Sequence, residues 1–90
     1  MLTNDQMHAV RATLDNVKHL NNEMTAYARN INDGAYSLSE VGLMFKDDFG
    51  KCLILANEIN SCFSWANVST YDIPQAVYNY LNERLEDLAA

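Results

Sequence analysis

The chain has 90 residues, a net charge of −6 and an apolar content of 49%, which together predict one globular domain and exclude a disordered chain. Its 12 acidic residues outnumber its 6 basic residues. This balance speaks against direct binding to nucleic-acid phosphates or to anionic membranes.

The scarcity of turn residues favours helices. With 3 glycines and 1 proline, the chain lacks the frequent tight turns that a β-sandwich or barrel needs. The first 20 residues carry charges throughout and do not resemble a signal peptide, and no run of 18 apolar residues predicts a membrane span. Cys52 and Cys62 would lie ~15 Å apart on one helix, too far to bond, so we expect reduced thiols and a cytoplasmic protein.

The first predicted helix covers residues 4–31, about 28 residues and ~42 Å. Thr3 and Gln6 fit a capping box at its start, and Gly34 fits the left-handed position after its end. An apolar seam with heptad spacing runs along it, formed by Met7, Val10, Leu14, Val17, Met24, Ala28 and Ile31 and interrupted by Asn21.

Asn21 is the distinctive residue of this seam. A polar residue at such a position can fix register and oligomeric state in a coiled coil. Three interpretations remain open: a hydrated Asn at the edge of an intramolecular seam, a register device in a dimer, or a contact to another protein. The residues predicted to serve self-association are Met7, Leu14, Asn21, Met24 and Ile31.

A second helix is predicted over residues 38–66, with Ser37 and Glu40 as its capping box. Its apolar residues cover most of its circumference, including Cys52 and Cys62 on the inner stripe, which is typical of a buried central element. Gly50 allows a break near 47–50. A third helix is predicted over 73–88, where Asp72 and Gln75 cap its start and Ile73, Val77, Leu81, Leu85 and Leu88 form its inner stripe.

The predicted fold is therefore all-α, a long antiparallel hairpin of the first two helices with a shorter third helix packed across it. Unequal helix lengths would leave apolar surface uncovered, which predicts a coiled-coil-like dimer or higher oligomer.

The spacing of the His, Cys, Asp and Glu residues does not predict a catalytic or metal site. Asp15, His19 and Glu23 share the outer face of the first predicted helix, but a convex surface offers no ligand pocket. Both cysteines are expected to be buried and unreactive, and no glycine-rich phosphate loop occurs. We therefore expect no enzyme activity, no metal and no cofactor.

The aromatic residues of the second half point to protein binding, because Trp and Tyr are frequent at hot spots. The predicted partner-contacting residues are Trp65, Tyr71, Tyr78 and Tyr80, with the acidic clusters Asp47, Asp48, Glu83, Glu86 and Asp87. In size, charge and class the chain resembles the small acidic helical inhibitors of phages and plasmids.

This resemblance implies a non-catalytic module that regulates or inhibits a partner, in the manner of an antirepressor that captures a basic DNA-binding protein. Two alternatives remain open: a DNA mimic that inhibits a nuclease or a restriction or CRISPR enzyme, and a purely structural coiled-coil subunit.

Overall fold

The computed structural model describes residues 1–89, and within this range the chain is helical, with no β-strand. The expected all-α class is thereby confirmed. The elements in chain order are α1 (Asn4–Asn16), α2 (Lys18–Asn32), α3 (Leu38–Asp47), α4 (Phe49–Cys62), the short 3-10 helix η1 (Thr70–Asp72) and α5 (Ile73–Ala89).

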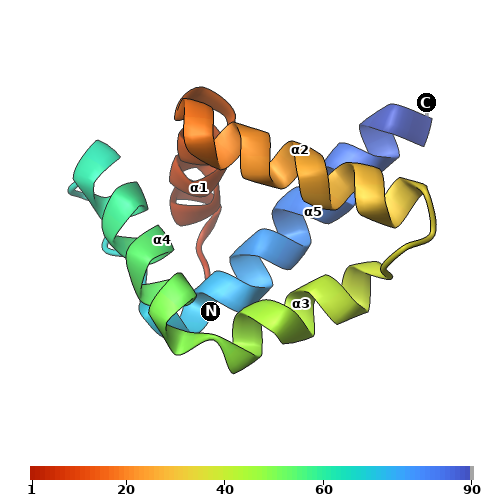
Figure 1. Cartoon of the computed structure of the whole chain (residues 1–90). Coiled ribbons are helices and arrows are strands. Elements are labelled where there is room, and N and C mark those ends of the chain that lie inside the picture. The colour runs from red at the N-terminus through yellow and green to blue at the C-terminus, as the bar shows by residue number, and fades with distance from the viewer. Residues whose placement is uncertain (90) are drawn as a thin grey trace.

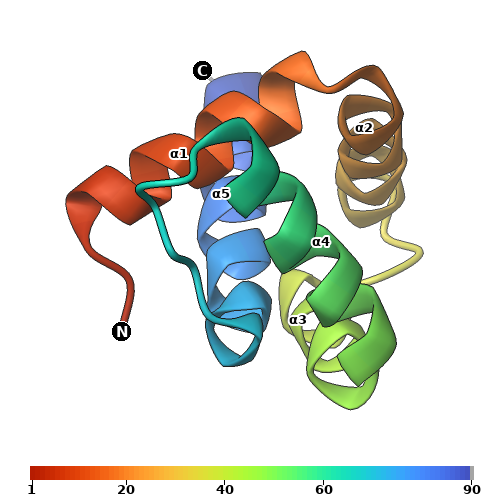
Figure 2. The ribbon, with the colours of Figure 1, turned by 90° about the vertical axis from the view of Figure 1, so that its left-hand side faces the viewer.

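The prediction of one continuous helix over 4–31 is wrong. The capping box of Thr3 and Gln6 forms as expected, but Val17 is extended, with φ −83° and ψ 112°, and separates α1 from α2. The two helices run in clearly different directions (Figures 1 and 2). A rod of ~42 Å would protrude from a body that measures 36 × 28 × 24 Å, whereas the bend lets both halves cover the same core.

The break also changes which residues face inward. Leu20, rather than Asn21, is buried after the bend, together with Met24 and Ala28. Asn21 is half-buried beside a polar cavity. The heptad reading fails here because it assumed a single straight axis.

The second predicted helix, 38–66, is broken near 47–50, where Gly50 allowed a break, and the break lies at Asp48. The Asp48 side chain accepts a hydrogen bond from the Lys51 backbone N–H at 3.0 Å and so caps the start of α4. This capping role explains why the polar Asp48 occurs within a heptad repeat whose other residues are apolar. The helix then ends at Cys62 rather than at residue 66, and Asn60 fixes the following turn through two hydrogen bonds to the Val68 backbone, at 3.0 and 2.8 Å.

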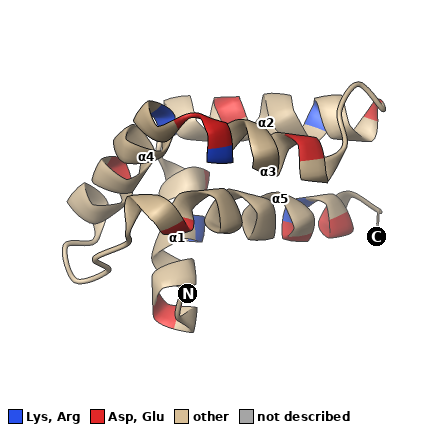
Figure 3. Cartoon of the chain, turned by 90° about the horizontal axis from the view of Figure 1, so that it is seen from below, with Lys and Arg blue, Asp and Glu red and all other residues tan. Residues whose placement is uncertain are grey.

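The predicted long hairpin is also wrong, because both of its arms are broken. Instead α5 contacts each of the other four α-helices and is the central element, a place we had predicted for the second helix. α3 lies alongside α5, and α2 crosses α5 toward the C-terminal end of α5 (Figures 1 and 3). Ile73, Val77 and Leu81 face inward as predicted, whereas Leu85 is half-buried and Leu88 is exposed.

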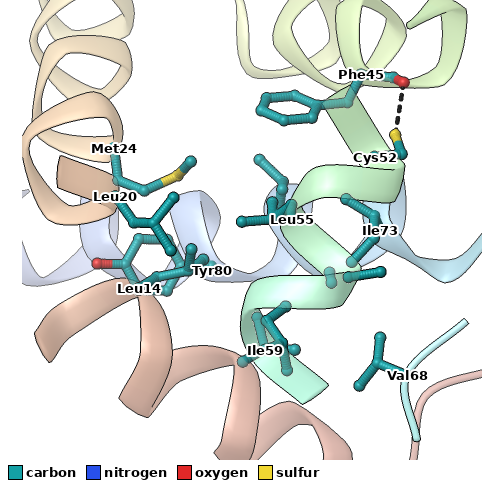
Figure 4. Close-up of a cluster of buried hydrophobic side chains, with 14 of the residues drawn as sticks. Leu14, Leu20, Met24, Phe45, Cys52, Leu55, Ile59, Val68, Ile73 and Tyr80 are labelled. Carbon is teal, nitrogen blue, oxygen red and sulfur yellow. Dashed lines mark hydrogen bonds between the residues drawn. The ribbon is translucent and has the colours of Figure 1, made fainter. Parts of the chain in front are cut away.

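The core lies where α1, α2, α4 and α5 converge. Leu20 and Met24 of α2 point toward Leu55 of α4, and Leu14 of α1 lies near the Tyr80 ring of α5 (Figure 4). Phe45 closes one side of this core, and its ring meets Tyr27 edge-on at 5.6 Å. No helix within residues 1–89 is long and apolar enough to cross a membrane.

Candidate functional site

A shallow groove runs between α3 and α5, and we call it the α3–α5 groove. Its volume is about 340 Å³, and its walls come from Ser39, Gly42, Leu43 and Lys46 on α3 and from Pro74, Gln75 and Tyr78 on α5. Gly42 forms its floor, where an added Cβ atom would lie 3.5 Å from the Tyr78 ring. The groove exists because a glycine faces an aromatic ring across two helices that pack side by side.

Two exposed aromatic rings lie at one end of this groove, and we call them the aromatic pair. Phe49 follows Lys46 by three residues, and Tyr71 precedes Pro74 by three residues. Their ring centroids are 5.8 Å apart, yet 54% of Phe49 and 82% of Tyr71 remain exposed. Rings that stay this exposed after packing together are typical of a binding surface rather than of a core.

Acidic residues flank the aromatic pair in the sequence. Asp47 ends α3, Asp48 lies between α3 and α4, and Asp72 ends η1. Lys46 adds one positive charge in the groove wall, and the amino group of Met1 lies 3.5 Å from Asp72. The groove wall therefore carries one positive charge, from Lys46, while the residues next to the aromatic pair in the sequence include the acidic Asp48 and Asp72.

Tyr80 was predicted to contact a partner, but the structure buries it between α1 and α5, with 5% of its surface exposed. Its hydroxyl donates to Asp15 at 2.6 Å. Burial and this carboxylate raise the pKa of Tyr80 to about 12. In this place Tyr80 ties α5 to α1 and offers little contact area to another molecule.

Further polar links surround the Tyr80 hydroxyl and join the same helices. Arg11 donates to both carboxylate oxygens of Glu83, at 2.6 and 2.7 Å, and this hydrogen bonding lowers the pKa of Glu83. Arg84 donates to the Thr25 hydroxyl of α2 at 2.6 Å. A polar cavity of about 330 Å³ opens among these side chains. These contacts hold α5 against α1 and α2.

The predicted partner-contacting residues are thus dispersed. Tyr78 lines the groove and Tyr71 lies at its end, while Trp65 packs on Phe63 at 5.7 Å in the connection after α4 and remains 58% exposed. Glu86 and Asp87 are exposed near the end of α5. They lie at the opposite end of α5 from Asp47 and Asp48, so the acidic residues do not form one row (Figure 3).

The predicted self-association residues lie mostly inside the chain. Met7, Leu14 and Met24 are buried in the intramolecular core, and Asn21 and Ile31 are half-buried. The narrow seam that motivated the coiled-coil prediction is therefore covered by this chain's own helices.

The two cysteines and the possible metal ligands were the remaining candidates for chemistry. Cys52 is buried, donates its thiol to the Phe45 carbonyl at 2.9 Å and has its pKa raised by burial. Cys62 is exposed, contrary to its predicted inner position, because α4 ends there. Residues 1–89 hold no cluster of three or more His, Cys, Asp or Glu that is suited to a metal.

Sequence reasoning missed Leu43, Gly42 and Pro74 as parts of a surface. It did predict uncovered apolar surface on the second helix, Phe49 included, because a helix that is apolar on most sides can bury only part of its circumference. It did not predict that Phe49 would pair with Tyr71.

Comparison of the chain with models of protein families, with curated proteins and with solved structures found no match.

Proposed function

We propose that this protein is a non-catalytic binding module that captures a basic, amphipathic segment of another protein in the α3–α5 groove and thereby regulates or inhibits it. An antirepressor-like capture of a DNA-binding regulator fits this description. The observation that carries the proposal is the groove of about 340 Å³ that ends at the exposed pair Phe49 and Tyr71.

The shape of the groove indicates what it would hold. A trough between two packed helices accepts the apolar face of a third helix, whose side chains at positions i, i+3 and i+4 occupy the trough. Leu43 and Tyr78 would flank such side chains, and the Gly42 floor lets them approach closely. The aromatic pair would add large, rigid contact area at one end.

Charge supports a basic partner. The chain carries −6 overall, and Asp47, Asp48 and Asp72 lie close to the aromatic pair. Such a field raises the association rate for a basic segment and loses effect as salt screens it. DNA-binding proteins present basic surfaces of this kind.

The test compares groove variants in affinity capture from host extract, followed by titration calorimetry with the purified captured protein. Leu43→Asp places a charge in the groove wall, and Gly42→Leu fills its floor, so both should weaken binding by about 10-fold or more. Gly42→Ala fits the available space and should bind nearly normally. Leu88→Asp introduces the same charge at an exposed leucine outside the groove and serves as the matched control.

The outcome separates the proposal from its alternatives. If the captured protein is a DNA-binding regulator, wild type should displace it from DNA and Leu43→Asp should not. A DNA mimic would instead lose binding when Asp47, Asp48, Glu86 and Asp87 are neutralised and would keep it in Leu43→Asp. A purely structural subunit would retain no other protein, which would contradict the proposal.

A further inference from the structure

A second surface, distinct from the α3–α5 groove, lies where α4 meets α2. Leu20 and Met24 of α2 and Phe45 and Leu55 nearby form an apolar recess of about 180 Å³, with Lys51, Ile54 and Glu23 at its margin. Ile54 remains 63% exposed there. A recess of this volume is larger than the engineered apolar cavity of about 150 Å³ that holds a benzene molecule, so it has room for a branched side chain.

Two polar contacts join α2 and α4 near this recess. At its margin, the Lys51 ammonium lies 3.0 Å from the Glu23 carboxylate and 2.7 Å from the Tyr27 hydroxyl. Outside the recess lining, His19 Nε2 lies 3.0 Å from the Glu58 carboxylate. The margin of the recess therefore carries one charge of each sign, from Lys51 and Glu23.

Lys51, Ile54 and Glu58 share one face of α4, because residues three and four apart lie on the same side of a helix. Ile54 is exposed on this face, whereas Lys51 and Glu58 are half-buried and already contact α2 within the chain. The midpoint between positions 51 and 58 falls between Ile54 and Leu55. If two copies of α4 cross antiparallel at that midpoint, Lys51 of each copy lies opposite Glu58 of the other. The same two-fold operation brings each Ile54 to the recess of the other copy.

We propose that this surface, which we call the α4 stripe, is the interface of a symmetric homodimer. A two-fold interface must be complementary to itself, and the stripe has this property in charge and in shape: lysine meets glutamate twice, and a protruding isoleucine meets an apolar recess. This interface shares no lining residue with the α3–α5 groove.

The test is sedimentation equilibrium of wild type and variants from about 10 μM to about 1 mM, with circular dichroism to verify helicity. Wild type should reach a dimer mass. Lys51→Glu alone and Glu58→Lys alone each place like charges opposite one another twice, and each should weaken the dimer by about 10-fold or more. A mixture of these two variants restores both lysine–glutamate pairs and should form a heterodimer.

Ile54→Asp should be monomeric, because it places a charge where the proposal puts an apolar contact. Leu43→Asp, in the other groove, should dimerise like wild type. The proposal is overturned if wild type stays monomeric over the whole range, or if the mixture of the two charge variants does not associate. A dimer that survives Ile54→Asp, or an Ile54-dependent contact only with a different protein, would also overturn it.

Discussion

Tyr80→Phe removes one hydroxyl from the interface of α1 and α5 and leaves the ring in place. In the native chain this hydroxyl donates to the Asp15 carboxylate at 2.6 Å. Hydrogen bonds to charged groups contribute about 1.5–3 kcal/mol. Asp15 is itself exposed and can return to water, so we expect the lower end, a loss of about 1.5 kcal/mol. For a domain of this size, this corresponds to a melting temperature lower by roughly 6–12 °C.

The pH dependence gives a second, independent measure of the same contact. The pKa of Tyr80 is about 12 in the folded chain against an ordinary 10.0, so the neutral hydroxyl is favoured by folding. The contribution of the neutral Tyr80 hydroxyl to the free energy of unfolding is fully present below pH 10 and is lost as the pH rises toward 12. The difference in unfolding free energy between wild type and Tyr80→Phe should therefore shrink across this interval.

Urea denaturation followed by circular dichroism, at several values between pH 7 and pH 11.5, measures both effects. Asn82→Ala, an exposed position on the same helix, is the control and should stay within about 0.5 kcal/mol of wild type. A loss below about 0.5 kcal/mol in Tyr80→Phe, or a loss that does not change with pH, would refute the structural role of this hydroxyl. The structural role would also be refuted if Tyr80→Phe kept its stability but no longer bound a partner protein.

Three further changes test local features of the fold by the same unfolding measurements. Glu83→Gln breaks the two hydrogen bonds from Arg11. The free energy of unfolding should fall by about 0.5–1 kcal/mol at pH 7. This difference from wild type should vanish at acid pH, where wild-type Glu83 becomes protonated below its lowered pKa. Asp48→Ala removes the cap of α4 and should lose about 1 kcal/mol, whereas Asp47→Ala should change little. Gly34→Ala forces φ of +81° on a residue with a Cβ atom and should lose about 1–2 kcal/mol, but Gly42→Ala should be neutral or stabilising.

The candidate site was only partly predictable from the sequence. Tyr71 and Tyr78 were expected to contact a partner, and they lie at the aromatic pair and in the groove. Tyr80 was expected to do the same, but it is turned by about 200° from Tyr78 on the helix and lies against α1. Which face of α5 is covered depends on where α1 and α2 lie, and that depends on the bend at Val17.

The sequence by itself determined the features that depend on neighbours within a few residues. The predicted capping boxes at Thr3 and Ser37 and the left-handed Gly34 are present, because each depends on groups only a few positions apart. The capping box predicted for Asp72 and Gln75 does not form: Asp72 lies 3.5 Å from the Met1 amino group, and the Gln75 side chain donates to Asn79 at 2.7 Å. Composition likewise determined the all-α class.

Only the tertiary structure decided that residues 4–32 form two helices, that α5 is central, and that Phe49, Leu43 and Ile54 remain exposed. Val17 is neither proline nor glycine, and no local signal marks it as a break. Its N–H still donates to the Thr13 carbonyl and its carbonyl still accepts from the Asn21 N–H, while its extended φ and ψ turn the chain. This turn lets Met7, Leu14 and Met24 reach one common core, and the gain arises from residues far apart in the chain.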